Sequence, residues 1–278
     1  MSPPGADPES RPGTLRFRCN ICGATNECPP EEIGRETRSC SCGSTARWRA
    51  VVHVLSTELF GTSLTLDDFP TRKDVRGLGL SDSRLYAEPL ARKFSYVNTF
   101  LDEAPKLDIT AADPALDDVY DFVIASDVFE HVPPPVERAF ANVRRILKPS
   151  GFLVLTVPYT EEGATVEHFP ALHRFEFLER SGLVVLRNVR SDGTVEEFDD
   201  LVFHDGPGLT LEMRRFAKPG LVAGLHAAGF ADVEFLSEPF LPYGVYWPAR
   251  WSLPCVARRM RRPGAAATPG PALSVSPR

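Results

Sequence analysis

Four cysteines near the N-terminus have the spacing of a metal site. Cys19 and Cys22 lie in a C-x2-C-G turn, and Cys40 and Cys42 lie in a shorter C-x-C-G turn. Two thiolate pairs on such turns supply the closed tetrahedral set that structural zinc prefers. We therefore predict a structural zinc ion on Cys19, Cys22, Cys40 and Cys42. Because the second turn is compressed, Cys28 is an alternative ligand to Cys40, and loss of the metal site is a further alternative.

Histidines in loop-like stretches are candidates for general bases, because imidazole exchanges a proton near neutral pH. We select His168 in EHFPALH and His204 in FHDGPG, and a hydrogen-bonded structural role is the alternative for each. His131, beside Glu130, is interpreted as a helix cap or as a wall of a ligand pocket. No histidine pair has the helical H-x3-H spacing of a metal site, so the sequence does not predict a catalytic metal ion.

Strand-like and helix-like segments alternate along the body of the chain. Apolar runs predict strands at 75–80, 95–100, 106–110, 120–125, 152–157 and 231–236. Apolar residues at helical spacing predict helices at 47–60, from 81 to about 94, at 133–151 and at 221–228. Such alternation is typical of an α/β fold with a doubly wound, mostly parallel sheet.

The same patterns divide the chain into parts. We expect a disordered N-terminus at 1–15, a zinc-ribbon-like module at 16–46 and a linking helix at 47–70. The main domain would span 71–260 and carry a hairpin insertion at 183–214, with a tight turn at 191–193 and a position suited to a lid over an acceptor. A disordered tail is expected at 261–278, where proline, glycine and small residues dominate.

Composition limits the function classes. The formal net charge of −6 disfavours broad contact with nucleic acid, which requires a basic surface. The N-terminus has no apolar signal region, and no apolar run approaches the roughly 20 residues needed to cross a bilayer. We therefore expect a cytoplasmic protein without membrane contact, in which clustered cysteines are reduced or bind metal.

The stretch 72–160 resembles the class I, Rossmann-like S-adenosylmethionine-dependent methyltransferases. The most specific motifs are DVFEHV, which ends a strand, and LKPSGFLVLTVP, which contains the next strand. VRGLGLSDSR resembles the glycine turn of that family, and 220–240 resembles its last helix and strand more loosely. The resemblance implies a Rossmann-like fold and a cofactor at the carboxyl ends of the strands.

The resemblance also implies which residues bind S-adenosylmethionine. Val75 stands at one position where the family has an acidic residue. At a second such position, which contacts the ribose, a neutral hydrogen bond from Asn98 or Thr99 would replace the usual acidic contact. Asp108 would bind the adenine amine, and Ile109 would pack on the ring. Capping of a helix or turn is the alternative role for Asp108 and for Asp127. The full cofactor set is Gly77, Leu78, Gly79, Ser81, Asn98, Thr99, Asp108, Ile109, Ser126 and Asp127.

The sequence thus predicts a methyltransferase that transfers a methyl group from S-adenosylmethionine to an unidentified acceptor. We expect a small molecule or a saccharide, because the acidic charge balance disfavours RNA. One alternative is an RNA or protein methyltransferase whose zinc module recognises the polymer. Another is a non-catalytic Rossmann-like binding module. The sequence makes no prediction about oligomeric state.

Overall fold

The computed structural model describes residues 13–204, 210–246 and 251–260. The predicted disordered tail at 261–278 lies outside the described residues, as does most of the predicted disordered segment 1–15. Within that segment, Leu15 already begins a strand. In the described part of the chain, no helix is long and apolar enough to cross a membrane.

The N-terminal module is a two-stranded antiparallel sheet followed by a loop and a helix. Strands β1 (Leu15–Arg18) and β2 (Thr25–Cys28) pair, and a 3-10 turn follows at Pro30–Glu32. Helix α1 (Ala46–Phe60) is preceded by Thr45, whose side chain accepts a hydrogen bond from the backbone N–H of Trp48, and is followed by Gly61 with a φ of 70°. The predicted helix at 47–60 is therefore confirmed.

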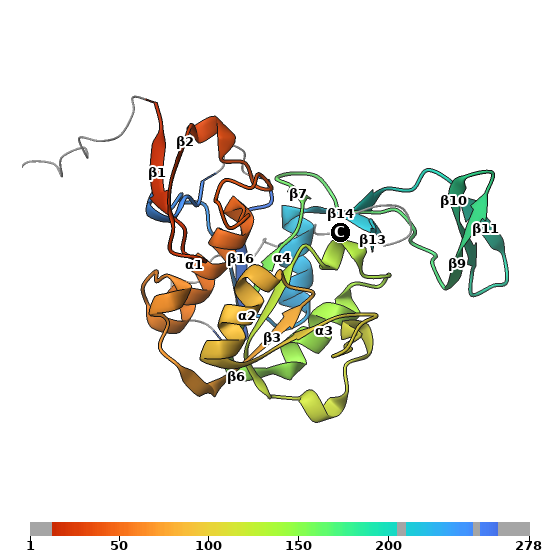
Figure 1. Ribbon diagram of the computed structural model, residues 1–278. Helices are drawn as coiled ribbons and strands as arrows, with labels where there is room; N and C mark the ends of the chain where they lie inside the picture. Colours follow the sequence, from red (N-terminus) through yellow and green to blue (C-terminus); the bar gives the residue numbers. More distant parts are fainter. Residues whose placement is uncertain (1–12, 205–209, 247–250, 261–278) are drawn as a thin grey trace, which may run out of the picture.

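A six-stranded sheet forms the centre of the molecule (Figure 1), in the order β15-β16-β6-β5-β3-β4. The strands are β3 (Arg72–Leu80), β4 (Phe94–Thr99), β5 (Tyr120–Ser126), β6 (Leu147–Thr156), β15 (Asp232–Phe235) and β16 (Cys255–Arg258). The pairs β4–β3, β3–β5 and β5–β6 are parallel, whereas β16 runs antiparallel to both of its neighbours. The predicted mostly parallel sheet is confirmed.

Helices cover both faces of this sheet, and alternate strand residues bury against each layer. On β5, Val123 and Ala125 belong to one apolar cluster together with α3 (Glu137–Ile146) and α4 (Lys218–Ala227). Phe122 and Ile124 belong to the other cluster, together with α1 and α2 (Arg84–Lys93). The strand period of two explains this division. Helix α1 is thus more than a linker, because it supplies part of one helical layer.

Two predicted elements differ from the structure. The strand expected at 106–110 is absent: the segment forms one isolated bridge between Phe100 and Lys106 and then a 3-10 turn, Ile109–Ala111. The helix expected at 133–151 is shorter, because consecutive prolines at 133–135 precede α3 and the next strand already begins at Leu147.

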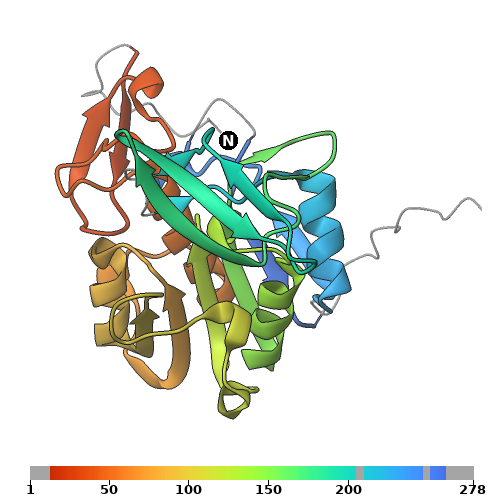
Figure 2. The same cartoon turned by 90° about the vertical axis from the view of Figure 1, so that its right-hand side faces the viewer.

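The insertion after β6 forms three small sheets. Strand β14 (Arg214–Ala217) lies between β7 (Tyr159–Thr160) and β8 (Val166–Glu167), and β12 (Phe203–His204) pairs with β13 (Thr210–Leu211). The third sheet, β9 (Arg174–Arg180), β10 (Leu183–Val189) and β11 (Val195–Phe198), projects from the body as an arm (Figure 1) and is seen in front of the other elements in the turned view (Figure 2). The hairpin turn predicted at 191–193 is confirmed, because Arg190 N–H donates to Thr194 O at 2.8 Å.

Candidate functional site

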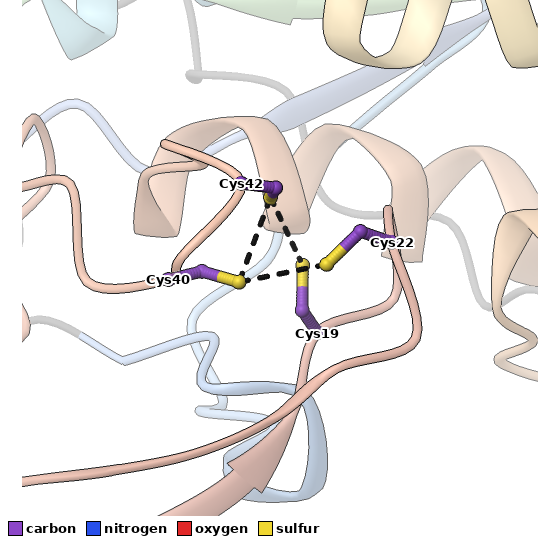
Figure 3. A group of neighbouring side chains, drawn as sticks. All are labelled: Cys19, Cys22, Cys40 and Cys42. Carbon is purple, nitrogen blue, oxygen red and sulfur yellow. Dashed lines mark hydrogen bonds between the residues drawn. The ribbon is translucent and has the colours of Figure 1, made fainter.

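The four cysteines of the predicted metal site come together in the module (Figure 3). Their sulfur atoms all lie within 4.8 Å of one another. The Sγ–Sγ distances are 3.5 Å for Cys40–Cys42, 3.6 Å for Cys22–Cys40 and 3.9 Å for Cys19–Cys42. Four thiolates bound tetrahedrally at about 2.3 Å from zinc would lie roughly 3.8 Å apart. The cluster therefore has dimensions that fit zinc.

Both cysteine turns are closed by a glycine in the left-handed region. Gly23 has a φ of 78° and Gly43 a φ of 86°, and their N–H groups donate to the carbonyls of Cys19 and Cys40 at 2.8 Å. The compressed second turn therefore still directs its two sulfurs into the cluster. Cys28 lies on β2 among other apolar side chains, outside the cluster.

The electrostatics of the cluster favour ionised sulfur at one position. Burial raises the pKa of Cys40, but hydrogen bonds from the Cys42 backbone and the neighbouring thiols outweigh it and lower this pKa to about 6. A thiol with such a pKa is mostly thiolate at neutral pH, and thiolate is the form that binds metal.

A fully buried arginine lies behind the sulfur atoms. The Arg49 guanidinium donates to Ser39 Oγ and Gly244 O at 2.9 Å and to Ser44 Oγ at 3.2 Å, and Ser44 Oγ lies 3.2 Å from Cys19 Sγ. A zinc ion with four thiolates carries net negative charge, which a nearby guanidinium offsets. The sequence offers Arg49 only as part of the basic RWR segment at 47–49, because its contact with Gly244 lies far along the chain.

The predicted cofactor-binding residues at the carboxyl edge of the sheet begin where β3 and β4 end. Ser81 follows β3 with a φ of 57°, and its N–H donates to Thr99 O at 2.7 Å. Asn98 exchanges two hydrogen bonds of 2.9 Å with the backbone of Asp82. Thr99 Oγ1 donates to Gly79 O at 2.8 Å. These four predicted residues, Gly79, Ser81, Asn98 and Thr99, lie together where β3 and β4 end.

Gly77 and Leu78 differ from the other predicted cofactor residues. Leu78 is 1% exposed in the apolar core, and a Cβ at Gly77 would lie 2.2 Å from the Phe122 ring. Both residues are therefore enclosed within the sheet and do not reach its carboxyl edge. The absence of a side chain at Gly77 makes room for an aromatic ring, and the turn itself begins only after Leu80.

An acidic residue that the sequence did not single out lies at this turn. Asp82 is buried and accepts hydrogen bonds from the hydroxyls of Tyr86 and Tyr96. Burial raises the pKa of Asp82 to about 7, although both tyrosine hydroxyls lower it. Tyr96, Asp82 and Asn98 also occupy the space in front of Gly79, where a Cβ would meet all three side chains.

Two arginines of the N-terminal part reach the carboxyl end of β5. Arg35 donates to both oxygens of Asp127 at 2.9 and 2.5 Å, and Arg47 donates to Ser126 Oγ at 2.6 Å. Thr156, at the end of β6, donates to Asp127 at 2.8 Å. Burial raises the pKa of Asp127, but the two guanidinium groups outweigh it and hold this pKa below its usual value.

This ionic cluster is incompletely paired. Arg47 makes two further hydrogen bonds to Glu36, at 2.7 and 2.8 Å. Among the described residues, the buried Nε of Arg35 has no hydrogen-bond partner. Buried polar groups are rarely left unpaired, so this donor marks a place where a ligand would be accommodated. Arg47 belongs to the basic segment RWR at 47–49, whereas no local pattern singles out Arg35.

The predicted adenine-binding pair has local partners. Asp108 Oδ1 accepts from the N–H and hydroxyl of Thr110 at 2.8 and 2.7 Å, which is the capping role expected as its alternative. Ile109 is 6% exposed and packs in the core beside α3, where Asn142 binds its carbonyl. The capping bond uses one carboxylate oxygen of Asp108, which is otherwise exposed at the surface.

Both predicted base candidates meet at one carboxylate. His168 Nε2 lies 2.9 Å from Glu212 Oε1, and His204 Nε2 lies 3.4 Å from Glu212 Oε2. His131 joins them, because its Nε2 lies 3.2 Å from His204 Nδ1. The sequence did not predict this grouping, because the insertion brings β8, β12 and β13 back to the residues that follow β5.

Residues 73–155 match the family model described as a methyltransferase domain, which spans β3 to β6 apart from the first residue of β3 and the last of β6. The match covers less than half of the chain and indicates a methyltransferase domain over this stretch. A search of curated proteins finds no match to this chain.

Several solved structures resemble this chain at low sequence identity. A 1,6-didemethyltoxoflavin N1-methyltransferase from Burkholderia thailandensis is 15% identical, with 77% of each chain covered and a TM-score of 0.42. The PH0226 protein from Pyrococcus horikoshii is 13% identical, with 76% of this chain and 90% of that chain covered and a TM-score of 0.42. DesVI from Streptomyces venezuelae is 16% identical, with coverages of 69% and 87% and a TM-score of 0.38.

Proposed function

We propose that the chain transfers the methyl group of S-adenosylmethionine to a small-molecule acceptor, with saccharides as the first class to test. The cofactor would bind along the turn after β3 and the carboxyl ends of β4 and β5. Gly79, Ser81, Asn98 and Thr99 form its first wall, and Ser126 and Asp127 form the second. Asp108 and Ile109 would flank the adenine. Gly77 and Leu78 would not contact the cofactor directly.

The observation that carries the proposal is the charged cluster at the end of β5. The amino-acid end of S-adenosylmethionine has both a carboxylate and an ammonium group. Arg35 and Arg47 match the carboxylate, and Asp127 matches the ammonium. The unpaired Nε of Arg35 supports a ligand at this place. On binding, the cofactor would exchange one of the internal ion pairs for contacts of the same kind.

We assign His168 as the general base for acceptors that carry a proton at working pH. The Glu212 carboxylate accepts from the Nε2–H of His168, which leaves Nδ1 as the basic nitrogen. The bound cofactor would supply the methyl group, so that the acceptor–carbon bond would form as the sulfur–carbon bond breaks, with S-adenosylhomocysteine as the leaving group. The acceptor proton passes to His168. The remaining task of the protein is to align the three atoms and exclude water.

We further propose that Cys19, Cys22, Cys40 and Cys42 hold a structural zinc ion. Four ligands leave no open position for chemistry, so the metal would stabilise the module that carries Arg35. The net charge of −6 favours a small acceptor over RNA.

Calorimetry with S-adenosylhomocysteine tests the cofactor assignment. We expect saturable binding to the full chain and at least tenfold weaker binding to Arg47→Met, because a charge-assisted hydrogen bond contributes about 1.5–3 kcal/mol. Arg187→Met, an exposed arginine of the arm, is the matched control and should bind as the wild type does. If the wild type shows no saturable binding, the proposal fails and the domain becomes a non-catalytic binding module.

A further inference from the structure

A second group of ligand-type side chains lies beside the proposed acceptor site. Glu130, His131 and His204 place a carboxylate oxygen and two ring nitrogens within 4.8 Å of one another. Glu130 and His131 follow β5 in a 3-10 turn, and His204 ends β12 in the insertion. The two parts meet because Met213 N–H donates to Glu130 O at 2.7 Å and His131 Nδ1 contacts Leu211 O at 3.0 Å.

The Glu130 side chain lacks a partner that its burial requires. It is 1% exposed, and neither carboxylate oxygen has a hydrogen-bond partner among the described residues. A buried, unpaired carboxylate costs several kcal/mol, so such groups normally pair with a cation, bind a metal or take up a proton. One of its oxygens lies 4.0 Å from His131 Nε2, which is the nitrogen turned towards His204.

The two imidazoles also lack a consistent neutral arrangement. The Leu211 carbonyl only accepts, so His131 carries its proton on Nδ1 and presents a lone pair at Nε2. If His204 donates from Nδ1 to that lone pair, its Nε2 lone pair faces the Glu212 carboxylate at 3.4 Å. If His204 instead carries its proton on Nε2, two lone pairs face each other at 3.2 Å. A positive charge between the rings removes the conflict.

We propose that Glu130, His131 and His204 bind one divalent transition-metal ion of the zinc type. Two histidines and one glutamate form a ligand set of catalytic zinc sites, which keep a position open for water or substrate. Two nitrogens bound at about 2.0–2.1 Å in a tetrahedral site lie roughly 3.3 Å apart, close to the separation of the two ring nitrogens. This site is separate from the cysteine cluster and does not depend on the identity of the acceptor.

The surroundings of the three ligands have the arrangement expected around a metal. A metal-binding histidine usually donates its second nitrogen to a carbonyl or carboxylate, which fixes the ring. Leu211 O takes this place for His131, and Glu212 takes it for His204. Glu212 also binds His168, which links the proposed general base to the metal site. The helical H-x3-H spacing did not predict this site, because two of its ligands are adjacent in the chain and the third comes from the insertion.

Metal stoichiometry on the full chain tests this proposal. Protein stripped with a chelator would be reloaded with Zn²⁺, dialysed, and measured by mass spectrometry of the metal. We expect the wild type to retain one more zinc ion per chain than the double variant His131→Gln/His204→Gln. The comparison is independent of whether the cysteine cluster is loaded, because both proteins keep Cys19, Cys22, Cys40 and Cys42. Equal zinc contents would overturn the proposal.

A milder variant covers the case in which the double variant does not fold. Glu130→Gln keeps the size of the side chain and removes its charge, so we expect at least tenfold weaker zinc binding at this site in a competition with a chromophoric chelator. His173→Gln, which alters an exposed histidine, is the matched control and should leave both zinc content and affinity unchanged. Unchanged affinity in Glu130→Gln would also overturn the proposal.

Discussion

At the scale of single residues, the buried carboxyl of Asp82 dominates the turn after β3. Its oxygens accept hydrogen bonds from Tyr86 and Tyr96, and its backbone is held by Asn98. Burial raises its pKa from an ordinary value near 4 to about 7. Between these values the folded chain keeps a proton that the unfolded chain has released, so stability falls as the pH rises through this window.

We therefore expect the Asp82→Asn variant to lose this pH dependence. From pH 5 to pH 7, Asp82 should lower the free energy of unfolding of the wild type by about 2 kcal/mol, at roughly 1.4 kcal/mol per pH unit. Urea unfolding of both proteins at the two pH values measures the difference, with Asp102→Asn at an exposed position as the control. Parallel pH dependence in wild type and Asp82→Asn would contradict a raised pKa at Asp82.

Residue roles were only partly predictable from the sequence. The cysteine spacing predicted the four sulfurs that meet in the module, because adjacent ligands on short turns are local in the chain. The partners of Asp127 and of Glu212 were not predictable, because they depend on how the module and the insertion fold back onto the sheet. The acidic residue at the glycine turn was missed because Asp82 follows the two glycines by several positions.

At the scale of elements, the packing of β3 against β5 requires a glycine, because an aromatic ring fills the space that a side chain would take. A Cβ at Gly77 would overlap the ring of Phe122 on the neighbouring strand β5. We expect Gly77→Ala to lower the free energy of unfolding by about 1–3 kcal/mol through overpacking. In the double variant Gly77→Ala/Phe122→Leu, the smaller side chain should recover part of that loss, measured as a favourable coupling energy in urea unfolding.

If the changes in unfolding free energy of the two single variants simply added up in the double variant, this packing would be contradicted. Phe122→Leu alone serves as the control, because it removes the ring without adding a Cβ. Its loss of stability should come only from the buried atoms removed and the cavity they leave. The glycine was predicted as a cofactor contact from its family position, and in the structure its lack of a side chain makes room for the Phe122 ring.

The compressed cysteine turn gives a second prediction at this scale. Cys40→Ser should lose the zinc ion of the cluster and lower the melting temperature, because metal binding stabilises a small module. Cys28→Ser is the matched control and should retain the zinc ion and the melting temperature of the wild type, because Cys28 lies on β2 outside the cluster. Zinc content and thermal unfolding measure both variants. Loss of metal in Cys28→Ser would instead assign the ligand to β2.

Most elements followed from local pattern. Helix α1 and the sheet strands other than β16 were predictable because their apolar periodicity is regular and their ends carry glycine, proline or polar caps. Strand β16 was not predicted from the sequence. The segment 106–110 was not, since an apolar run of strand-like composition makes only one bridge, to Phe100 just after β4, and turns at Asp108. A strand needs a partner as well as a pattern, and no neighbouring strand among the described residues extends far enough along this segment.

At the scale of the whole molecule, the N-terminal module packs against the main domain. Ile21 and two of the cysteines share one apolar cluster with α1, α2 and the central sheet. Leu66 N–H donates to Asn20 O, and Asn20 donates to Arg49 O, both at 2.8 Å. The module and the helical layer that contains α1 therefore share apolar packing and hydrogen bonds.

We expect removal of residues 1–45 to affect the entire chain. The truncated protein should be less stable by about 3 kcal/mol or more, because apolar side chains of α1 lose their cover. It should also bind S-adenosylhomocysteine more weakly, because Arg35 is absent. Urea unfolding and calorimetry measure the two effects. Unchanged stability and cofactor affinity would make the module independent and would favour the hypothesis that it recognises a protein or RNA acceptor.

The contact of Arg35 with Asp127 has one more consequence. Arg35 lies between the two cysteine turns, and its partner lies in the proposed cofactor site. A metal that orders those turns and a cofactor that engages the arginine would bias the same segment, so their binding free energies would be linked. Linkage is reciprocal: cofactor would raise zinc affinity by the same factor as zinc raises cofactor affinity. A change in zinc concentration would then change the fraction of chains that hold cofactor at a given cofactor concentration.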